Sequence, residues 1–320
     1  MDYSFCEYKN NLFFEIRDFL IQTYNEESYR FNWFMDRWNF CRYFSHVTHD
    51  VVNTWPDTVG IWRNMEGQII GVVNSEGENR GEAFFQLKNL QNPKNLYIDM
   101  LRFAESKLAC KENDDMILNV RVDVNDHELI NLFKENEYEQ TDKKECTCSM
   151  LLKNNKKIEI GDGFRITDGL EVSGRQRADA HIKAFGINDA DKETRIIANN
   201  TLRLSPDYDP SLDISAVDDK NEVASFATIW FDEKNKIGIY EPVGTVPEYR
   251  NRGLGRAVIY TGMNKLLKLG CRKVYVGSDQ LFYKSLGFTV DFIKEIWQKR
   301  WTIDQYGGLS RVPAASIPEA

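Results

Sequence analysis

The sequence predicts an α/β protein built from two halves that share one order of secondary-structure elements. Three observations support this prediction. The chain has 320 residues, about the length of two domains. Strand-like runs bounded by turn residues are separated by segments in which apolar residues recur at helical spacing. The same order of segments returns after a polar, lysine-rich link at 153–163.

The first half begins with two helices rich in aromatic residues. Phe13, Ile16, Leu20 and Tyr24 recur at helical spacing, and the stretch 31–44 mixes aromatic residues with arginines. We interpret this aromatic band as a packed core or a domain interface, with a ligand pocket as the alternative. Three strands, a helix, a strand, a helix and a strand follow, at 59–64, 68–74, 82–87, 96–108, 116–122, 127–136 and 146–152.

The second half repeats this order behind two further helices. We expect a strand at 163–167, helices near 175–185 and 194–204, strands at 212–219, 222–231 and 236–246, a helix at 253–270, a strand at 273–278, a helix at 281–287 and a strand at 288–297. The predicted domains are therefore 1–154 and 155–305. The tail at 306–320 has the composition of a mobile C-terminus.

Charge and composition exclude several classes of protein. The 41 basic and 49 acidic residues give a net charge of −8, which opposes a general attraction to nucleic acids or anionic membranes. No apolar run approaches the ~20 residues that span a bilayer. The acidic N-terminus is unlike a secretory signal, so we expect a cytoplasmic protein. The six cysteines and four histidines are scattered, which predicts neither a disulfide scaffold nor a metal site.

The stretch 241–257, EPVGTVPEYRNRGLGRA, is the most informative for chemistry. A strand runs into an Arg- and Gly-rich loop that opens a long helix, and the unpaired N–H groups of such a helix start can bind a pyrophosphate. Gly253 and Gly255 would let that ligand approach the backbone. Three arginines add positive charge: Arg250, Arg252 and Arg256.

Two other phosphate-binding motifs do not fit these residues. A P-loop needs Gly-Lys-Ser/Thr, whereas Gly255 is followed by Arg256-Ala257. A dinucleotide fingerprint needs a third glycine or alanine where Val258 stands.

The six residues Arg250–Gly255 resemble motif A of the GCN5-related N-acetyltransferase (GNAT) superfamily, Arg/Gln-x-x-Gly-x-Gly/Ala. The later stretch 282–288, FYKSLGF, resembles the end of its motif B. The resemblance implies two tandem GNAT-like domains, each with a mixed, mostly antiparallel sheet flanked by helices. It covers 163–300 directly and the first half only in element order and in its last helix and strand.

The first half departs from the family pattern at the positions that would carry chemistry. The stretch 88–96, KNLQNPKNL, lacks the Arg-x-x-Gly-x-Gly core, and Phe133 stands where the second half has Tyr283. We therefore expect a degenerate first half that does not use the cofactor.

The resemblance implies a site for acetyl-CoA, without a metal, at the end of the strand 236–246. The pyrophosphate would lie on Arg250, Asn251, Arg252, Gly253, Leu254, Gly255 and Arg256. The N–H of Val243 would face the thioester carbonyl, and Gly244 and Thr245 would hold the pantetheine arm. Pro242 removes one donor from the ladder, consistent with strand pairing that stops there.

Two side chains are the candidate catalytic groups under this resemblance. Tyr283 would donate a proton to the departing CoA sulfur, and its alternative role is packing on the helix end. Glu241 would accept a proton from the incoming amine, and its alternative roles are to position substrate or to pair with an arginine. Strand alternation places Ile239, Glu241 and Val243 on one face, unless a bulge at Pro242 breaks the parity.

The predicted function is an N-acetyltransferase that moves an acetyl group from acetyl-CoA to a primary amine of a small molecule or peptide, by direct attack in a ternary complex. The protein would act as a monomer or homodimer, without nucleic acid or membrane partners. A non-catalytic acyl-CoA sensor or interaction module is the first alternative. Aminoacyl transfer from tRNA is the second, and both the acidic composition and the intact loop disfavour it.

Overall fold

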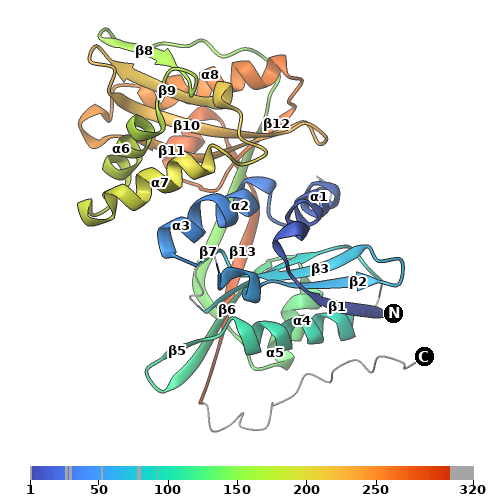
Figure 1. The fold of residues 1–320 in the computed structure, drawn as a ribbon. Helices are drawn as coiled ribbons and strands as arrows, with labels where there is room; N and C mark the ends of the chain where they lie inside the picture. The colour runs from blue at the N-terminus through green and yellow to red at the C-terminus, as the bar shows by residue number, and fades with distance from the viewer. Residues whose placement is uncertain are drawn as a thin grey trace.

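The computed structural model describes residues 2–25, 28, 31–51, 53–77, 81–91 and 93–302 (Figure 1). The tail predicted at 306–320 lies outside the described residues. Within these ranges, no helix combines the length and the apolar character needed to cross a membrane.

The described strands form one mixed, mostly antiparallel sheet that runs through both halves. Its order is β1-β2-β3-β4-β6-β13-β7-β12-β11-β10-β9-β8, with β5 paired to β6. The strands are β1 (Tyr3–Glu7), β2 (Gly60–Asn64), β3 (Ile69–Asn74), β4 (Glu82–Leu87), β5 (Cys110–Glu112), β6 (Asp115–Asp123), β7 (Glu139–Leu151), β8 (Phe164–Thr167), β9 (Asp213–Asp218), β10 (Val223–Asp232), β11 (Ile237–Thr245), β12 (Lys273–Val276) and β13 (Thr289–Thr302).

The helices flank this sheet, and α2 and α3 lie between the two halves (Figure 1). They are α1 (Phe13–Thr23), α2 (Met35–Phe40), α3 (His46–His49), α4 (Lys94–Lys107), α5 (His127–Glu135), α6 (Gly174–Phe185), α7 (Lys192–Leu202), α8 (Leu254–Lys268) and α9 (Leu281–Leu286). A π-helical turn, Cys41–Ser45, joins α2 to α3.

The two halves exchange their last strands. β7, which ends the first half, pairs with β12 of the second half, and β13, which ends the chain's sheet, pairs with β6 of the first half. β7 and β13 also pair with each other, so they form the bridge between the halves. The predicted limits near residue 155 remain a prediction, because the hydrogen-bonded ladder crosses that point.

The predicted fold class and the repeated element order are confirmed, with three differences. β1 and β5 were not expected, because β1 alternates weakly and β5 has only three residues. The strand predicted at 146–152 is the apolar part of β7, which begins at Glu139. Its polar part forms a strand because it pairs with β13, and such a long-range pairing leaves no apolar pattern in the sequence.

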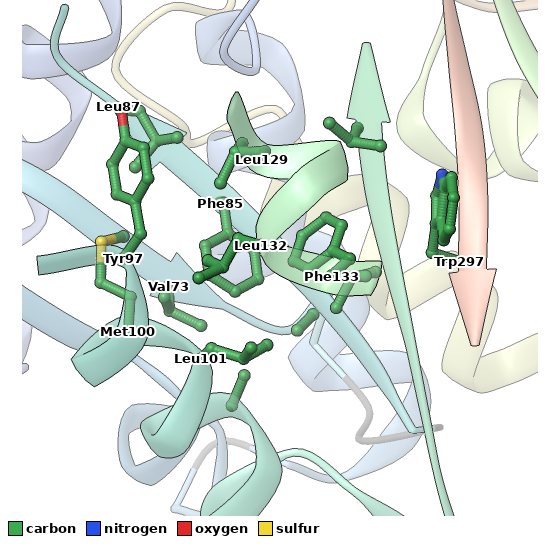
Figure 2. Packing of buried hydrophobic residues seen from close by; sticks show 14 of the residues in the cluster. Val73, Phe85, Leu87, Tyr97, Met100, Leu101, Leu129, Leu132, Phe133 and Trp297 are labelled. Atoms are coloured by element: carbon green, nitrogen blue, oxygen red, sulfur yellow. The ribbon is translucent and has the colours of Figure 1, made fainter. Parts of the chain in front are cut away.

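The hydrophobic core of the first half includes a side chain from the exchanged strand β13. Side chains of α4 and α5 pack on the sheet, among them Met100, Leu129 and Phe133 (Figure 2). Trp297 of β13 belongs to the same cluster and is 4% exposed. The second half therefore contributes a large apolar side chain to the core of the first, and separating the halves would expose it.

A further cluster holds α2 and the π-helical turn against the second half. Met35 and Phe44 pack with Trp230 and Tyr275. An ion pair from Arg17 of α1 to Asp207 (Nε to Oδ2 2.8 Å) and a hydrogen bond from Asn39 Nδ2 to the same carboxylate (2.7 Å) reinforce the contact. The aromatic band at 31–44 thus forms a core and a domain interface, as its composition predicts, and some of its aromatic residues also line a cavity between the halves.

Candidate active site

The candidate site lies where β11 and β12 separate. The two strands pair in parallel only from Ile237 to Tyr240 on β11, although β11 continues to Thr245. Val246 donates its N–H to Ala224 on the β10 side. Alternation along the strand therefore directs the N–H groups of Val243 and Thr245 the other way, into the gap between the strands. This open edge presents backbone donors to a ligand.

A bulge lies at the start of the gap. Ala227 of β10 pairs with Val243 and Ile229 pairs with Tyr240, so Glu241 and Pro242 together face the single residue Thr228. The extra residue changes the parity of the strand. Val243 consequently packs with the cluster around Tyr240, whereas Glu241 and Ile239 line a cavity on the other face. The alternation that would place Ile239, Glu241 and Val243 on one face is therefore wrong, and the bulge is the reason.

The loop before α8 is open toward solvent. Gly253 caps the helix with a left-handed φ of 78°, and a Cβ built there would meet no atom within 4 Å. Asn251 also has a positive φ, 62°. Asn251, Arg252 and Arg256 are exposed around this helix start. The 15-residue helix thus presents free backbone N–H groups and positive charge in an uncovered cradle.

Arg250 holds the loop in place. Its guanidinium donates to Thr245 O (3.2 Å) at the end of β11 and to Ala184 O (3.0 Å) near the end of α6. The two bonds fix the loop between the open strand and the neighbouring helix. The Arg250 guanidinium is therefore occupied by hydrogen bonds to two carbonyl groups. The exposed side chains of Arg252 and Arg256 supply the other positive charges around the cradle.

The start of α9 meets the end of β11 and the start of α8. A Cβ built on Gly255 would lie 3.1 Å from Phe282 Cζ and 3.4 Å from Thr245 Oγ1. The next residue, Tyr283, is half-buried against Phe288, with ring centroids 5.9 Å apart. Burial and the nearby Glu241 carboxylate raise the pKa of Tyr283 above its usual value of 10.0, so its phenol keeps its proton at neutral pH.

A cavity of about 790 Å³ opens on the other side of the gap. Both halves line it. The first half and β7 contribute residues that include Trp33, Asp36 and Glu145, and the second half contributes Arg195 and Glu241 among others. The volume is that of a small-molecule site.

Glu241 is the titratable group at the meeting point of the gap and the cavity. Its Oε2 lies 3.9 Å from the place of a Cβ on Gly277, just past the end of β12. The side chain is accessible from the cavity. The partial loss of water around the carboxylate, together with the charges of Asp36 and Glu76, outweighs Arg37 and raises the pKa of Glu241 from 4.5 to about 7. A carboxylate with that pKa can accept a proton near neutral pH.

The structure brings most of the predicted site residues together. Val243, Tyr283 and Leu254 at the start of α8 belong to one hydrophobic cluster beside the gap, and the Glu241 carboxylate acts electrostatically on Tyr283. Gly244 lies on β11 directly opposite Phe226, whose ring fills the space that a side chain would need. Leu254 is buried in the core and can offer only its backbone.

Sequence reasoning missed the residues that the first half contributes to the cavity. Asp36, Arg37 and Glu76 line it, together with Lys294 of the exchanged strand. The aromatic composition of 31–44 was a signal for a ligand pocket, but it is equally typical of a core. The charged residues Asp36 and Arg37 within that segment favour a ligand pocket over a core. Their position in the cavity wall is evident only from the three-dimensional structure.

The sheet, the open gap and the glycine-rich helix start define the fold class of the GCN5-related N-acetyltransferases. Residues 180–288 match the model of the acetyltransferase (GNAT) family. The predicted resemblance to the GNAT superfamily, in a tandem arrangement, is confirmed. This fold supports acyl transfer from acyl-CoA. No curated protein is significantly similar in sequence.

Solved structures with this fold match nearly the whole chain. A tandem GNAT protein from the clavulanic acid biosynthesis pathway has a TM-score of 0.62 at 13% identity, over 93% of this chain and 98% of its own. A GCN5-related N-acetyltransferase from Sphaerobacter thermophilus has 0.59 at 13% identity, over 93% and 95%. Saccharomyces cerevisiae N-myristoyltransferase with bound myristoyl-CoA has 0.52 at 11% identity, over 93% and 79%.

In the described part of the chain, no group of three or more His, Cys, Asp or Glu side chains is arranged to hold a metal ion.

Proposed function

We propose that this protein is an N-acetyltransferase that transfers the acetyl group of acetyl-CoA to a primary amine of a small molecule or peptide, in a ternary complex. The observation that carries the proposal is the open edge of β11, which leads from the uncovered start of α8 to a carboxylate at the mouth of a cavity. In this proposal the donor would bind on one side of the gap and the acceptor on the other.

Acetyl-CoA fits the residues present. The exposed backbone and the side chains of Arg252 and Arg256 would hold its pyrophosphate, with Asn251, Gly253, Leu254 and Gly255 offering backbone groups. Thr245 and Gly244 would border its pantetheine arm. When bound, it supplies the activated acyl group. Arg250 would hold this loop in position through its hydrogen bonds to two carbonyl groups.

The side chains around the gap provide the proton transfers of the reaction. An ammonium must lose a proton before its nitrogen can attack, and Glu241 Oε2 can accept that proton directly or through water. The N–H of Val243 points into the gap, where it can stabilise negative charge that develops on a carbonyl oxygen. The Tyr283 hydroxyl holds a proton on the other wall of the gap, available to the departing sulfur.

Isothermal titration with acetyl-CoA tests the donor site. The variant R252E/R256E reverses both exposed charges of the cradle without entering the core. We expect one acetyl-CoA per wild-type chain and at least tenfold weaker binding in the variant. Lys268→Glu, at the exposed far end of the same helix, is the matched control and should bind normally. Absence of binding by the wild-type protein would overturn the proposal.

Thiol release in the presence of amines then separates an enzyme from a sensor. An enzyme releases CoA at a rate that depends on the amine and forms the N-acetylated product, which mass spectrometry detects. Binding of acetyl-CoA without transfer to any amine in the panel would favour the non-catalytic acyl-CoA sensor instead.

A further inference from the structure

Asp36 is an unusual residue in the wall of the cavity. It lies in the first turn of α2, is 8% exposed and lines the cavity. Its Oδ1 atom is buried and has no hydrogen-bond partner. The Arg37 charge and backbone N–H groups at the helix start favour its ionised form, but burial outweighs them, so a cationic group of a ligand would stabilise this carboxylate further.

The other acids around Asp36 already have partners. Glu76 pairs with Arg37 (Oε2 to Nη2 2.9 Å), and Glu145 pairs with Arg121. Asp213, at the far side of the cavity, pairs with Arg177. Among the described residues, neither Asp36 nor Glu241 forms an ion pair. Arg195, Arg203 and Lys294 also line the cavity without forming an ion pair with either carboxylate, so these two carboxylates have no paired cation among the described residues.

The two unpaired carboxylates belong to one electrostatic environment. Asp36 raises the pKa of Glu241, so their charges interact across the cavity. Burial raises the pKa of Asp36 itself from 3.8 to about 6, which leaves it ionised at pH 7 and above. Two mutually repelling negative charges in one enclosed space favour a ligand with two positive charges.

We propose that Asp36, supplied by the first half, binds a second cationic group of the acceptor while the reacting amine lies at Glu241. The acceptor class is then a diamine or a larger polycation rather than a simple monoamine. This inference rests on the proposed function for the identity of the reacting amine. It also gives the first half a role in substrate recognition that requires no cofactor site of its own.

A comparison of diamines with matched monoamines tests the inference by direct binding. Protein saturated with CoA is titrated calorimetrically with α,ω-diamines of three to six carbons and with the n-alkylamines of equal length, at pH 8.5. We expect at least one diamine to bind wild type ten or more times as tightly as its monoamine. Asp36→Asn should reduce that preference to about twofold or less and leave acetyl-CoA affinity unchanged.

The matched control is Asp142→Asn, which removes the same charge from an exposed position on β7. It should keep the diamine preference, and circular dichroism checks the fold of both variants. A wild-type protein without diamine preference overturns the inference, as does a preference that survives Asp36→Asn.

The outcome for the proposed function is read separately. Failure to bind acetyl-CoA and to acetylate any amine contradicts the acetyltransferase, whereas diamine binding that depends on Asp36 would still support the cation site. Acetylation of mono- and diamines with equal efficiency and equal affinity supports the acetyltransferase and overturns the cation site.

Discussion

In each half of the molecule, two neighbouring parallel strands separate at the corresponding place in the sheet. The groups that lie in the two resulting gaps are different. In the first half, β4 and β6 pair only at Glu82 and Ala83, so the rest of β4 has no partner on that side. In the second half, β11 and β12 separate after Tyr240. The topology thus creates a gap twice, and the groups that lie in the two gaps differ.

The first gap is closed by the chain itself. Lys88 donates its N–H to Ile70 on the β3 side, so the N–H and C=O of Leu87 point into the gap. The Asn32 side chain bonds both groups, accepting from Leu87 N (2.8 Å) and donating to Leu87 O (3.0 Å). Trp33 N–H bonds Gln86 Oε1 (2.8 Å) beside it. A side-chain amide therefore occupies the edge where the second half leaves backbone donors open.

The helix starts differ in the same sense. α8 begins after Gly253 in a left-handed conformation, which leaves an open cradle. α4 begins at Lys94 after Pro93, whose φ is −82° and whose nitrogen carries no hydrogen to donate. The comparison explains in physical terms why the first half was expected to be degenerate. It also shows that one segment serves both halves: Asn32 closes the first gap, and Asp36, four residues on, lines the cavity before the second.

The largest expected effect concerns the carboxylate of the open gap. Glu241→Gln removes the proton acceptor and should lower kcat/KM about 100- to 10,000-fold, the usual range for general base catalysis. In the wild type, log kcat/KM should rise with pH through about 7, since Glu241 must lose its proton before it can accept one. Initial rates across pH 5.5–9 measure this rising limb of the pH profile.

A second variant checks whether Glu241 is the group that titrates. Asp36→Asn removes a negative charge that raises the pKa of Glu241, so the limb should move to lower pH. A limb near pH 7 that persists in Glu241→Gln would assign the proton transfer to another group.

The next effect is on the free energy of unfolding. It compares Asp36, which forms no ion pair, with Glu76, which pairs with Arg37. The pKa of Asp36 rises from 3.8 to about 6 on folding. The folded state then binds the proton more tightly, so the wild type loses stability as pH rises from about 4 to 6 and stays lower above that. Asp36→Asn should be about 3 kcal/mol more stable than wild type at pH 7.5 and similar at pH 4. Denaturant unfolding at both pH values measures the difference.

The control for this measurement is Glu76→Gln, which breaks the ion pair with Arg37 and should destabilise the protein at pH 7.5. Equal stability of Asp36→Asn and wild type at both pH values would show that Asp36 is compensated within the protein.

The sequence was sufficient to predict the repeated topology, and the residues proposed for the donor side of the site could be named from it. Motif A lies in one continuous stretch, because a strand end and the next helix start form the cradle together. The acceptor side was not predictable in the same way. Asp36 becomes a site residue only because α2 packs against the second half, and Asn32 closes the first gap only because it meets Leu87, 55 positions away.

A smaller effect is expected when the closure of the first gap is removed. Asn32→Ala leaves the N–H and C=O of Leu87 without their partner and should cost about 2 kcal/mol of unfolding free energy. Asn64→Ala, whose side chain bonds only within an exposed turn, is the control and should cost less than about 1 kcal/mol. Denaturant unfolding measures both.

The same variant asks whether an open edge is enough for cofactor binding. Because α4 lacks the glycine-capped start of α8, Asn32→Ala should still bind one acetyl-CoA per chain in calorimetry. A second binding site in this variant would mean that the Asn32 amide alone separates the two halves.

The smallest effect is expected at the position where the halves differ by one hydroxyl. Phe133 is fully buried on α5, whereas Tyr283 on α9 keeps a hydroxyl near Glu241. Tyr283→Phe makes the second half resemble the first and should lower kcat about tenfold at pH 7 without changing acetyl-CoA affinity. The loss is modest because a thiol with a pKa of about 8.5 is already a fair leaving group. The control is Tyr260→Phe on α8, because Tyr260 packs against the same hydrophobic cluster as Tyr283; this variant should keep full activity. An unchanged kcat in Tyr283→Phe would assign the tyrosine a packing role and leave the open edge of β11 as the difference between the halves that matters for turnover.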